Sequence, residues 1–260
     1  MKYGIVELSV IPGRAEPSDK SEMVTQLLFG DIFSIIEESN KFIRVKIQYD
    51  NYECWICKKQ FLPIDKNEFI EISNSPYHCV TDLVHVISYK KKIFPIVQGS
   101  CLPNFQNGEF TLDNHKVLFE GNVSIPSKIG SKDKIVEDAL MYLNAPYLWG
   151  GKSPFGIDCS GFTQIVYKIN NIVIPRDAYQ QAKLGESYSF LEEAEAGDIA
   201  FFDNEEGRIN HVGIVVGKNK IIHASGKVRI DLIDETGIYN SKAEKYSHEL
   251  FFPRPFQKDT

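Results

Sequence analysis

The 260-residue sequence has few cysteines, no long apolar run and no excess of positive charge. Its five cysteines are an odd number without a paired framework, which argues against a disulfide scaffold and favours a reducing compartment. No segment approaches the length of a membrane span, so we expect no membrane partner. The net charge of -6 argues against a general nucleic-acid binder. At 43% hydrophobic and 25% charged residues, the chain reads as a globular protein of one or two domains.

The N-terminus lacks the pattern of a secretion signal. Lys2 is followed by a short apolar stretch that Glu7 interrupts, and no small-residue cleavage site comes after it. If Met1 is the true start, we expect a cytoplasmic protein. If the start has been trimmed, a periplasmic or secreted location stays open.

Cys159 draws attention because of the residues that follow it. Residues 162–167 have the apolar spacing of a buried helix, which puts Cys159 at a helix N-terminus. Unpaired backbone N–H groups and the helix dipole favour an anion there, so the pattern predicts a thiol with a lowered pKa. Gly161 would let a substrate backbone come close. The alternative is a buried helix cysteine without chemistry.

Two histidines follow on what read as neighbouring strands. A cysteine nucleophile needs a base, and that base needs an orienting partner, roles that suit His211 and His223. The two imidazoles share a face only if His223 pairs with Gly213 or Val215. A tight loop would pair it with Ile214, on the other face. The sequence leaves this register open.

Three segments are expected along the chain, with an α+β fold class overall. Residues 1–64 contain short strands with regular turn signals, which is typical of a small β-barrel. Residues 65–125 hold weaker strand signals and predict a second, degenerate barrel. Residues 126–260 hold helices and then strands, which indicates an α+β domain. The expected strands are 5–10, 24–29, 32–36, 42–47, 49–56, 83–87, 93–97, 99–103, 108–112, 115–119, 211–216 and 220–225, and the first helix of the last segment is 132–143.

Six motifs in the last segment occur in one order, and together they resemble those of the NlpC/p60 cysteine peptidases. They are Tyr147-x-Trp149-Gly150-Gly151, Asp158–Phe162, Pro175–Asp177, Gly197–Ile199, His211–Ile214 and Ile222–Ser225. The resemblance implies a papain-like core that cleaves peptides of bacterial peptidoglycan. It also implies that Cys159 is the nucleophile, His211 the general base and acid, and His223 the polar third member.

Tyr147 matches a tyrosine whose hydroxyl lies near the oxyanion in this family. The backbone N–H of Cys159 would be the other donor to the oxyanion. Simple aromatic packing is the alternative for both Tyr147 and Trp149.

The first segment resembles a bacterial SH3-like domain. The matching stretches are Leu27–Asp31, Phe42–Val45 and Asn51–Ile56. In the last stretch Asn51 and Cys54 replace glycines of the usual motif, and Phe42 replaces a tryptophan. The implied layout is a papain-like NlpC/p60 domain preceded by two small SH3-like β-barrels.

This layout resembles the γ-D-glutamyl-L-diamino acid endopeptidases of cell-wall peptide recycling. The implied substrate is a murein tripeptide or tetrapeptide, L-Ala-γ-D-Glu-diaminopimelate, cut after D-Glu. A free L-Ala amine is required in such enzymes because one barrel blocks that end of the groove. A buried ammonium needs carboxylates, and Glu22 with Tyr52 are the candidates to hold it.

The resemblance also places substrate contacts in the catalytic domain. Asp158, Ser160 and Asp177 match positions that hold the substrate, although Asp158 could instead brace its loop. Arg176 is expected as an internal salt-bridge partner that could also reach a substrate carboxylate. Trp149 is a further candidate contact. Ala178 stands where some relatives have a hydroxyl residue, which puts one substrate hydrogen bond in question.

Other chemistry-bearing residues are set aside. Cys54 and Cys57 form a C-x-x-C within an expected strand, where their side chains point to opposite faces. No nearby residues complete a zinc site, so we expect no metal and no cofactor. His115 and His248 read as surface residues.

Two other functions stay open. One is an exported hydrolase that cuts intact peptidoglycan and uses the barrels as anchors. The other is a non-catalytic wall-binding protein, against which the presence of Cys159, His211 and His223 argues. We expect a monomer in each case.

Overall fold

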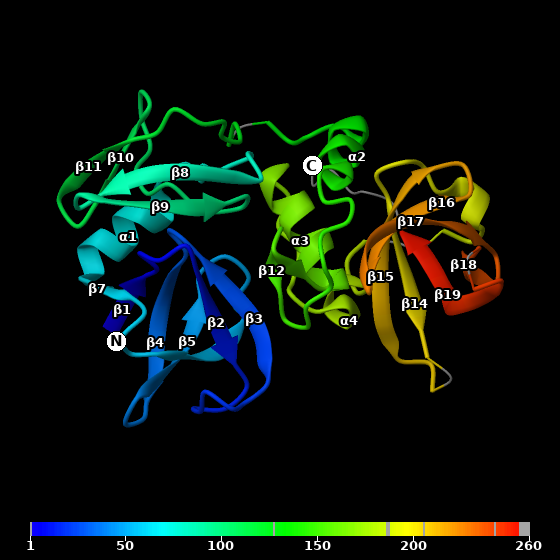
Figure 1. The fold of residues 1–260 in the computed structure, drawn as a ribbon, viewed down its shortest axis with the longest axis horizontal. Helices are drawn as coiled ribbons and strands as arrows, with labels where there is room; N and C mark the ends of the chain where they lie inside the picture. Colours follow the sequence, from blue (N-terminus) through cyan, green and yellow to red (C-terminus); the bar gives the residue numbers. More distant parts are fainter. Residues whose placement is uncertain (1, 127, 186–187, 205, 242, 255–260) are drawn as a thin grey trace. The chain divides into compact units, whose positions relative to one another are not determined.

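The computed structural model describes residues 2–126, 128–185, 188–204, 206–241 and 243–254. Its contacts divide the chain into two compact units (Figure 1). The first comprises Met1–Lys128 with Trp149–Pro154, and the second comprises Ile129–Leu148 with Phe155–Thr260. Among the described residues, no helix combines the length and apolar composition of a membrane span. The predicted domain boundaries after residues 64 and 125 stay predictions.

The first 64 residues form a seven-stranded antiparallel sheet in the order β3-β2-β6-β5-β4-β1-β7. The alternating burial expected for residues 42–47 is present in β5, whose apolar side chains face a core built around Phe33, Val45 and Ile56. The strands are β1 (Lys2–Ile5), β2 (Val10–Arg14), β3 (Met23–Leu28), β4 (Ile32–Glu38), β5 (Phe42–Ile47), β6 (Glu53–Cys57) and β7 (Leu62–Ile64).

The prediction for the first strand is wrong. Residues 5–10 were expected as one strand, but β1 ends at Ile5 and β2 runs from Val10 to Arg14. Pro12 lies within β2 opposite Gln26 of β3, whereas β2 pairs with β6 only at Arg14, so the β6 side of the proline carries no ladder.

In the next segment four of the five strands expected for residues 65–125 form, and the degenerate barrel stays a prediction. The segment forms a helix, α1 (Lys66–Asn74), and two hairpins, β8 (Val84–Tyr89) with β9 (Lys92–Val97) and β10 (Glu109–Leu112) with β11 (His115–Leu118). Residues 99–103 contain only an isolated bridge between Cys79 and Cys101. The hairpins pack on the first segment, since Phe110 and Val117 share one core with Phe29.

The second unit contains three α-helices and a closed six-stranded barrel, as far as its described residues go. Helix α2 starts where expected, because the Ser131 hydroxyl accepts the backbone N–H of Lys134, but it ends at Leu140. The elements of the second unit are α2 (Lys132–Leu140), β13 (Gly156–Ile157), α3 (Cys159–Ile169), α4 (Ala178–Gln181), the 3-10 turn η1 (Leu191–Glu193), β14 (Ile199–Asp203), β15 (Ile209–Gly217), β16 (Lys220–Ser225), β17 (Lys227–Asp234), β18 (Gly237–Asn240) and β19 (Lys245–Arg254). The short β12 (Lys152–Ser153) lies in the first unit.

The register between β15 and β16 places both predicted histidines on one face. His223 pairs with Gly213, two residues after His211, because a bulge between Val215 and Gly217 shifts the hairpin by one residue. A Cβ atom on Gly213 would lie 2.7 Å from Ile221 and 2.9 Å from the His223 Cβ. Gly213 therefore lets the two strands approach closely beside the imidazoles.

Candidate active site

Cys159 is the first residue of α3, as the sequence predicts. The Asp158 carboxylate caps the helix by accepting the Gly161 backbone N–H at 2.7 Å. Arg176, 1% exposed, holds this carboxylate with two hydrogen bonds of 2.6 and 3.1 Å. It also donates to the Ser160 hydroxyl at 2.8 Å. The expected salt bridge of Arg176 is thus present, and it fixes the loop that carries the nucleophile.

The electrostatic setting of Cys159 differs from the prediction of a lowered pKa. Burial and the nearby Asp158 carboxylate raise the pKa of the thiol to about 12. Arg176 and the backbone N–H groups of Ser160 and Val212 oppose this shift and are outweighed. The resting sulfur is therefore a neutral thiol, and it must lose its proton as it attacks. Its contact with the Val212 N–H places it beside the strand residue that follows His211.

A chain of hydrogen bonds leads away from His211. Its Nε2 lies 2.8 Å from His223 Nδ1, and His223 Nε2 lies 3.0 Å from the Asp231 carboxylate. His211 and His223 are 5% and 1% exposed, so solvent does not compete for these bonds. The prediction that His211 and His223 lie together is confirmed.

The acceptor-only carboxylate at the end of the chain assigns both tautomers. Ionised Asp231 cannot donate, so in a neutral His223 ring Nε2 carries the proton and Nδ1 accepts. His211 Nε2 then carries the donated proton, and its Nδ1 is left with a free lone pair. Burial, with contributions from His248 and His223, holds the pKa of His211 well below its ordinary value. A neutral ring with Nδ1 free can accept a proton, as the predicted role of general base requires.

Asp231 is hydrogen-bonded to His223 of the site and its neighbour Arg229 to Asp231, and the sequence analysis missed both. Arg229 donates a hydrogen bond of 2.6 Å to Asp231. Burial alone would raise the pKa of Asp231, but the hydrogen bonds from His223 and Arg229 outweigh it, so the pKa is lowered. Both residues lie on β17, two positions apart and therefore on one face. An Arg-x-Asp pair on the strand after His223 is the signal that would have found them.

Tyr147 lies in the same unit, half-buried. Burial, together with the neighbouring Cys159 and Asp158, raises the pKa of Tyr147 to about 12. At neutral pH the phenol keeps its proton and can donate it in a hydrogen bond. This setting is compatible with the expected oxyanion donor, a role that stays a prediction.

The remaining candidate substrate contacts fall in different places. Asp177 is half-buried at the start of α4, where its backbone N–H donates to the Gln180 side chain. In the first unit, the Trp149 indole donates to the Glu22 carboxylate at 2.6 Å. Tyr52 packs at the edge of the barrel core there. Their contacts with substrate stay predictions.

The reading of His248 as a surface residue is wrong. Its ring is partly buried and stacks on that of His211, with centroids 3.9 Å apart and planes at 19°. Nitrogen atoms of His211, His223 and His248 lie within 4.8 Å of one another, a spacing that invites a metal ion. A metal lies in the plane of each imidazole that binds it, however, and two stacked rings share no such position. We therefore assign His211 and His223 to proton transfer.

Two family models match the chain. The NlpC/P60 family model matches residues 144–246, and the bacterial dipeptidyl-peptidase SH3 domain model matches residues 13–61. The γ-D-glutamyl-L-lysine dipeptidyl-peptidase of Bacillus subtilis is 44% identical over 219 residues, or 77% of this chain and 71% of the relative. Dipeptidyl-peptidase 6 of Lysinibacillus sphaericus is 29% identical over 245 residues, or 85% and 88% of the two chains.

Solved structures share the fold. An NlpC/P60 family protein from Bacillus cereus superposes with a TM-score of 0.82 at 22% identity, over 97% of this chain and 99% of that one. An NlpC/P60 endopeptidase from Photobacterium damselae superposes with a TM-score of 0.71 at 17% identity, over 96% and 70% of the two chains. The α+β fold class with an SH3-like region ahead of the catalytic domain is confirmed.

A thiol at a helix start that meets the backbone N–H of Val212, the residue after a buried imidazole that a second imidazole orients, is the arrangement of a cysteine peptidase. The comparisons agree with that chemistry. The chain belongs to the NlpC/P60 family, in the group that carries a dipeptidyl-peptidase SH3 domain.

Proposed function

We propose that this enzyme hydrolyses the bond between γ-D-Glu and the diamino acid in small cell-wall peptides that carry a free N-terminal L-Ala. The observation that carries the proposal is the relay from His211 through His223 to Asp231, found in a chain 44% identical to a γ-D-glutamyl-L-lysine dipeptidyl-peptidase. The relative's name supports lysine as the diamino acid, whereas the sequence motifs suggested diaminopimelate.

The mechanism follows from the assigned tautomers. His211 Nδ1 takes the proton of Cys159 as the sulfur attacks the γ-carbonyl carbon of D-Glu. The oxyanion that forms would accept hydrogen bonds from the Cys159 backbone N–H and the Tyr147 hydroxyl. Protonated His211 then donates its proton to the amine of the leaving diamino acid, and a thioester remains. A water molecule, deprotonated by His211, releases L-Ala-γ-D-Glu and restores the thiol.

Asp231 matters most while His211 is protonated. The imidazolium donates a hydrogen bond from Nε2 to His223 Nδ1, and the Nε2–H of His223 donates in turn to the Asp231 carboxylate. The Asp231 charge therefore stabilises the positive charge through two hydrogen bonds. Arg229 keeps the carboxylate ionised, so that it remains an acceptor.

The test is cleavage of L-Ala-γ-D-Glu-L-Lys and L-Ala-γ-D-Glu-meso-diaminopimelate, each compared with its N-acetylated form. Preferred cleavage of the free amines is expected. Equal cleavage of the acetylated peptides would refute the requirement for free L-Ala. A Cys159→Ala variant serves as the inactive control.

The predicted amine contacts have their own test. Glu22→Gln should raise KM for the free-amine peptide and change cleavage of the acetylated one little, because only the first carries an ammonium. Tyr52→Phe should act in the same direction. An unchanged KM in both variants would move the amine site elsewhere.

Clearing of purified sacculi distinguishes the proposal from hydrolysis of intact peptidoglycan. We expect no loss of turbidity at enzyme concentrations that cleave the tripeptides within minutes. We also propose a cytoplasmic location and a monomeric enzyme. Fractionation of the source cells and the mass measured by light scattering test these two expectations.

A further inference from the structure

His248 has no role in the chemistry described so far, yet it covers one face of the catalytic base. Its ring lies parallel to that of His211, with centroids 3.9 Å apart. Phe202 approaches both rings, 5.8 Å from His211 and 6.2 Å from His248. His223 presents its edge to His248 at 5.9 Å. All four residues belong to the barrel of the second unit.

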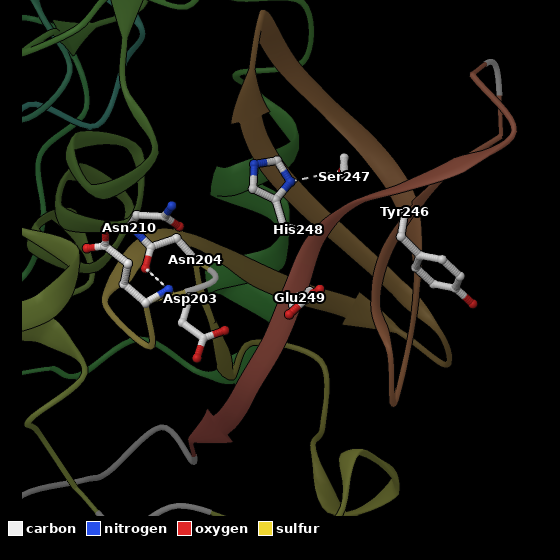
Figure 2. A pocket seen from close by; sticks show the side chains of 8 residues that line it. Asp203, Asn204, Asn210, Tyr246, Ser247, His248 and Glu249 are labelled. Carbon is white, nitrogen blue, oxygen red and sulfur yellow. Dashed lines mark hydrogen bonds between the residues drawn. The ribbon is translucent and has the colours of Figure 1, made fainter.

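The position of His248 is fixed on both sides. Its Nδ1 lies 2.9 Å from the Ser247 hydroxyl, and its backbone pairs with Ile238 on β18. The side chain also lines an open pocket of about 500 Å³ (Figure 2). That pocket is lined by Asp203, Asn204, Glu206, Asn210, Tyr246, Ser247, His248 and Glu249. His248 is thus part of the wall between this pocket and the His211 ring.

We propose that His248 is a positioning residue that clamps the His211 ring and, through its aromatic face, stabilises the imidazolium formed during turnover. A single hydrogen bond at Nε2 leaves the His211 ring free to tilt about that bond. A second ring stacked on its face removes this freedom and keeps Nδ1 directed at the nucleophile. When His211 takes the proton of Cys159, the neutral ring of His248 presents π density to the new cation.

This role requires His248 to be neutral, because a second cation stacked at 3.9 Å would repel the first. Burial, then His223, lower the pKa of His248 to about 4, although Asp231 acts in the opposite direction. The other charged groups that line the pocket with it are carboxylates: Asp203 on β14, Glu206 between β14 and β15, and Glu249 on its own strand. At neutral pH the stack therefore consists of two uncharged rings.

The test compares His248→Phe, which keeps an aromatic face, with His248→Leu, which keeps bulk without one. We expect His248→Phe to retain kcat within about threefold and His248→Leu to lose about tenfold in kcat, from the usual strength of cation–π contacts. KM should change little in either variant. His115→Ala, an exposed histidine of the first unit, is the matched control. Thermal unfolding shows that each variant is folded, and His248→Tyr replaces His248→Phe if the latter fails to fold.

A second readout needs no substrate and so stays valid if the proposed substrate is wrong. Iodoacetamide alkylates the thiolate of Cys159, and transfer of the thiol proton to His211 is one route to that thiolate, so the alkylation rate at a fixed neutral pH reports the stability of the imidazolium. Slower alkylation in His248→Leu than in His248→Phe supports the proposal. Equal rates and equal kcat values in these two variants would overturn it.

Discussion

Replacement of Asp231 by asparagine tests the relay most directly. The substitution keeps the size of the side chain but removes the charge that assigns the tautomers of His223 and His211. A hydrogen bond to a charged group contributes about 1.5–3 kcal/mol, which corresponds to about a 10- to 150-fold loss in kcat. His223 and His211 separate Asp231 from the reacting atoms in the chain of hydrogen bonds, so KM should change little.

The assay is steady-state hydrolysis of L-Ala-γ-D-Glu-L-Lys by wild-type protein and Asp231→Asn. Asp234→Asn is the matched control, because Asp234 lies on the same strand and bonds the Tyr246 hydroxyl instead of a histidine. Circular dichroism and thermal unfolding establish that the variants fold. If Asp231→Asn keeps wild-type kcat while folded, the acceptor-only argument for the tautomers fails.

Three further predictions concern charge and protonation. The pKa values of His211 and His248 in the folded protein lie below 6.5, so the unfolded chain binds more protons as the pH falls. The melting temperature should therefore fall as the pH drops from about 7 towards 4, and a flat profile would contradict both shifts. Since burial raises the pKa of Cys159, its alkylation by iodoacetamide should accelerate steadily from pH 6 to 9, whereas a plateau below pH 7 would indicate a resting thiolate. Arg176→Met should lower the free energy of unfolding in urea by about 3–5 kcal/mol, because it leaves a buried carboxylate unpaired. The same change at the surface residue Arg44 should have little effect.

Local signals predicted the central part of the site. The helix start at Cys159 follows from residues within one turn of it, and the hairpin of β15 and β16 follows from two short apolar runs. The register of this hairpin depends on a bulge between Val215 and Gly217 that no residue pattern predicts. The pKa of Cys159 was predicted in the wrong direction because the helix dipole is a local effect, whereas burial depends on the whole domain.

The residues that the sequence did not predict reach the site through pairing between segments that are far apart in the chain. His248 reaches His211 only because β19 pairs with β14 to close the barrel, a pairing between segments about 50 residues apart. Helix α1 is a different case. Asp65 caps it by accepting the N–H groups of Asn67 and Glu68, a start signal that the strand-like runs on either side obscured.

The six residues from Trp149 to Pro154 have a consequence for dissecting the protein. They follow Tyr147 closely in sequence, yet they pack with the barrel strand β3: the Lys152 N–H donates to Gln26, and a Cβ on Gly150 would meet the Met23 carbonyl. A fragment that ends at residue 128 would lack residues 149–154, which pack against its strand β3. The C-terminal fragment would carry that segment without its contacts to β3, so deletion experiments on this enzyme cannot be read as simple removal of a module.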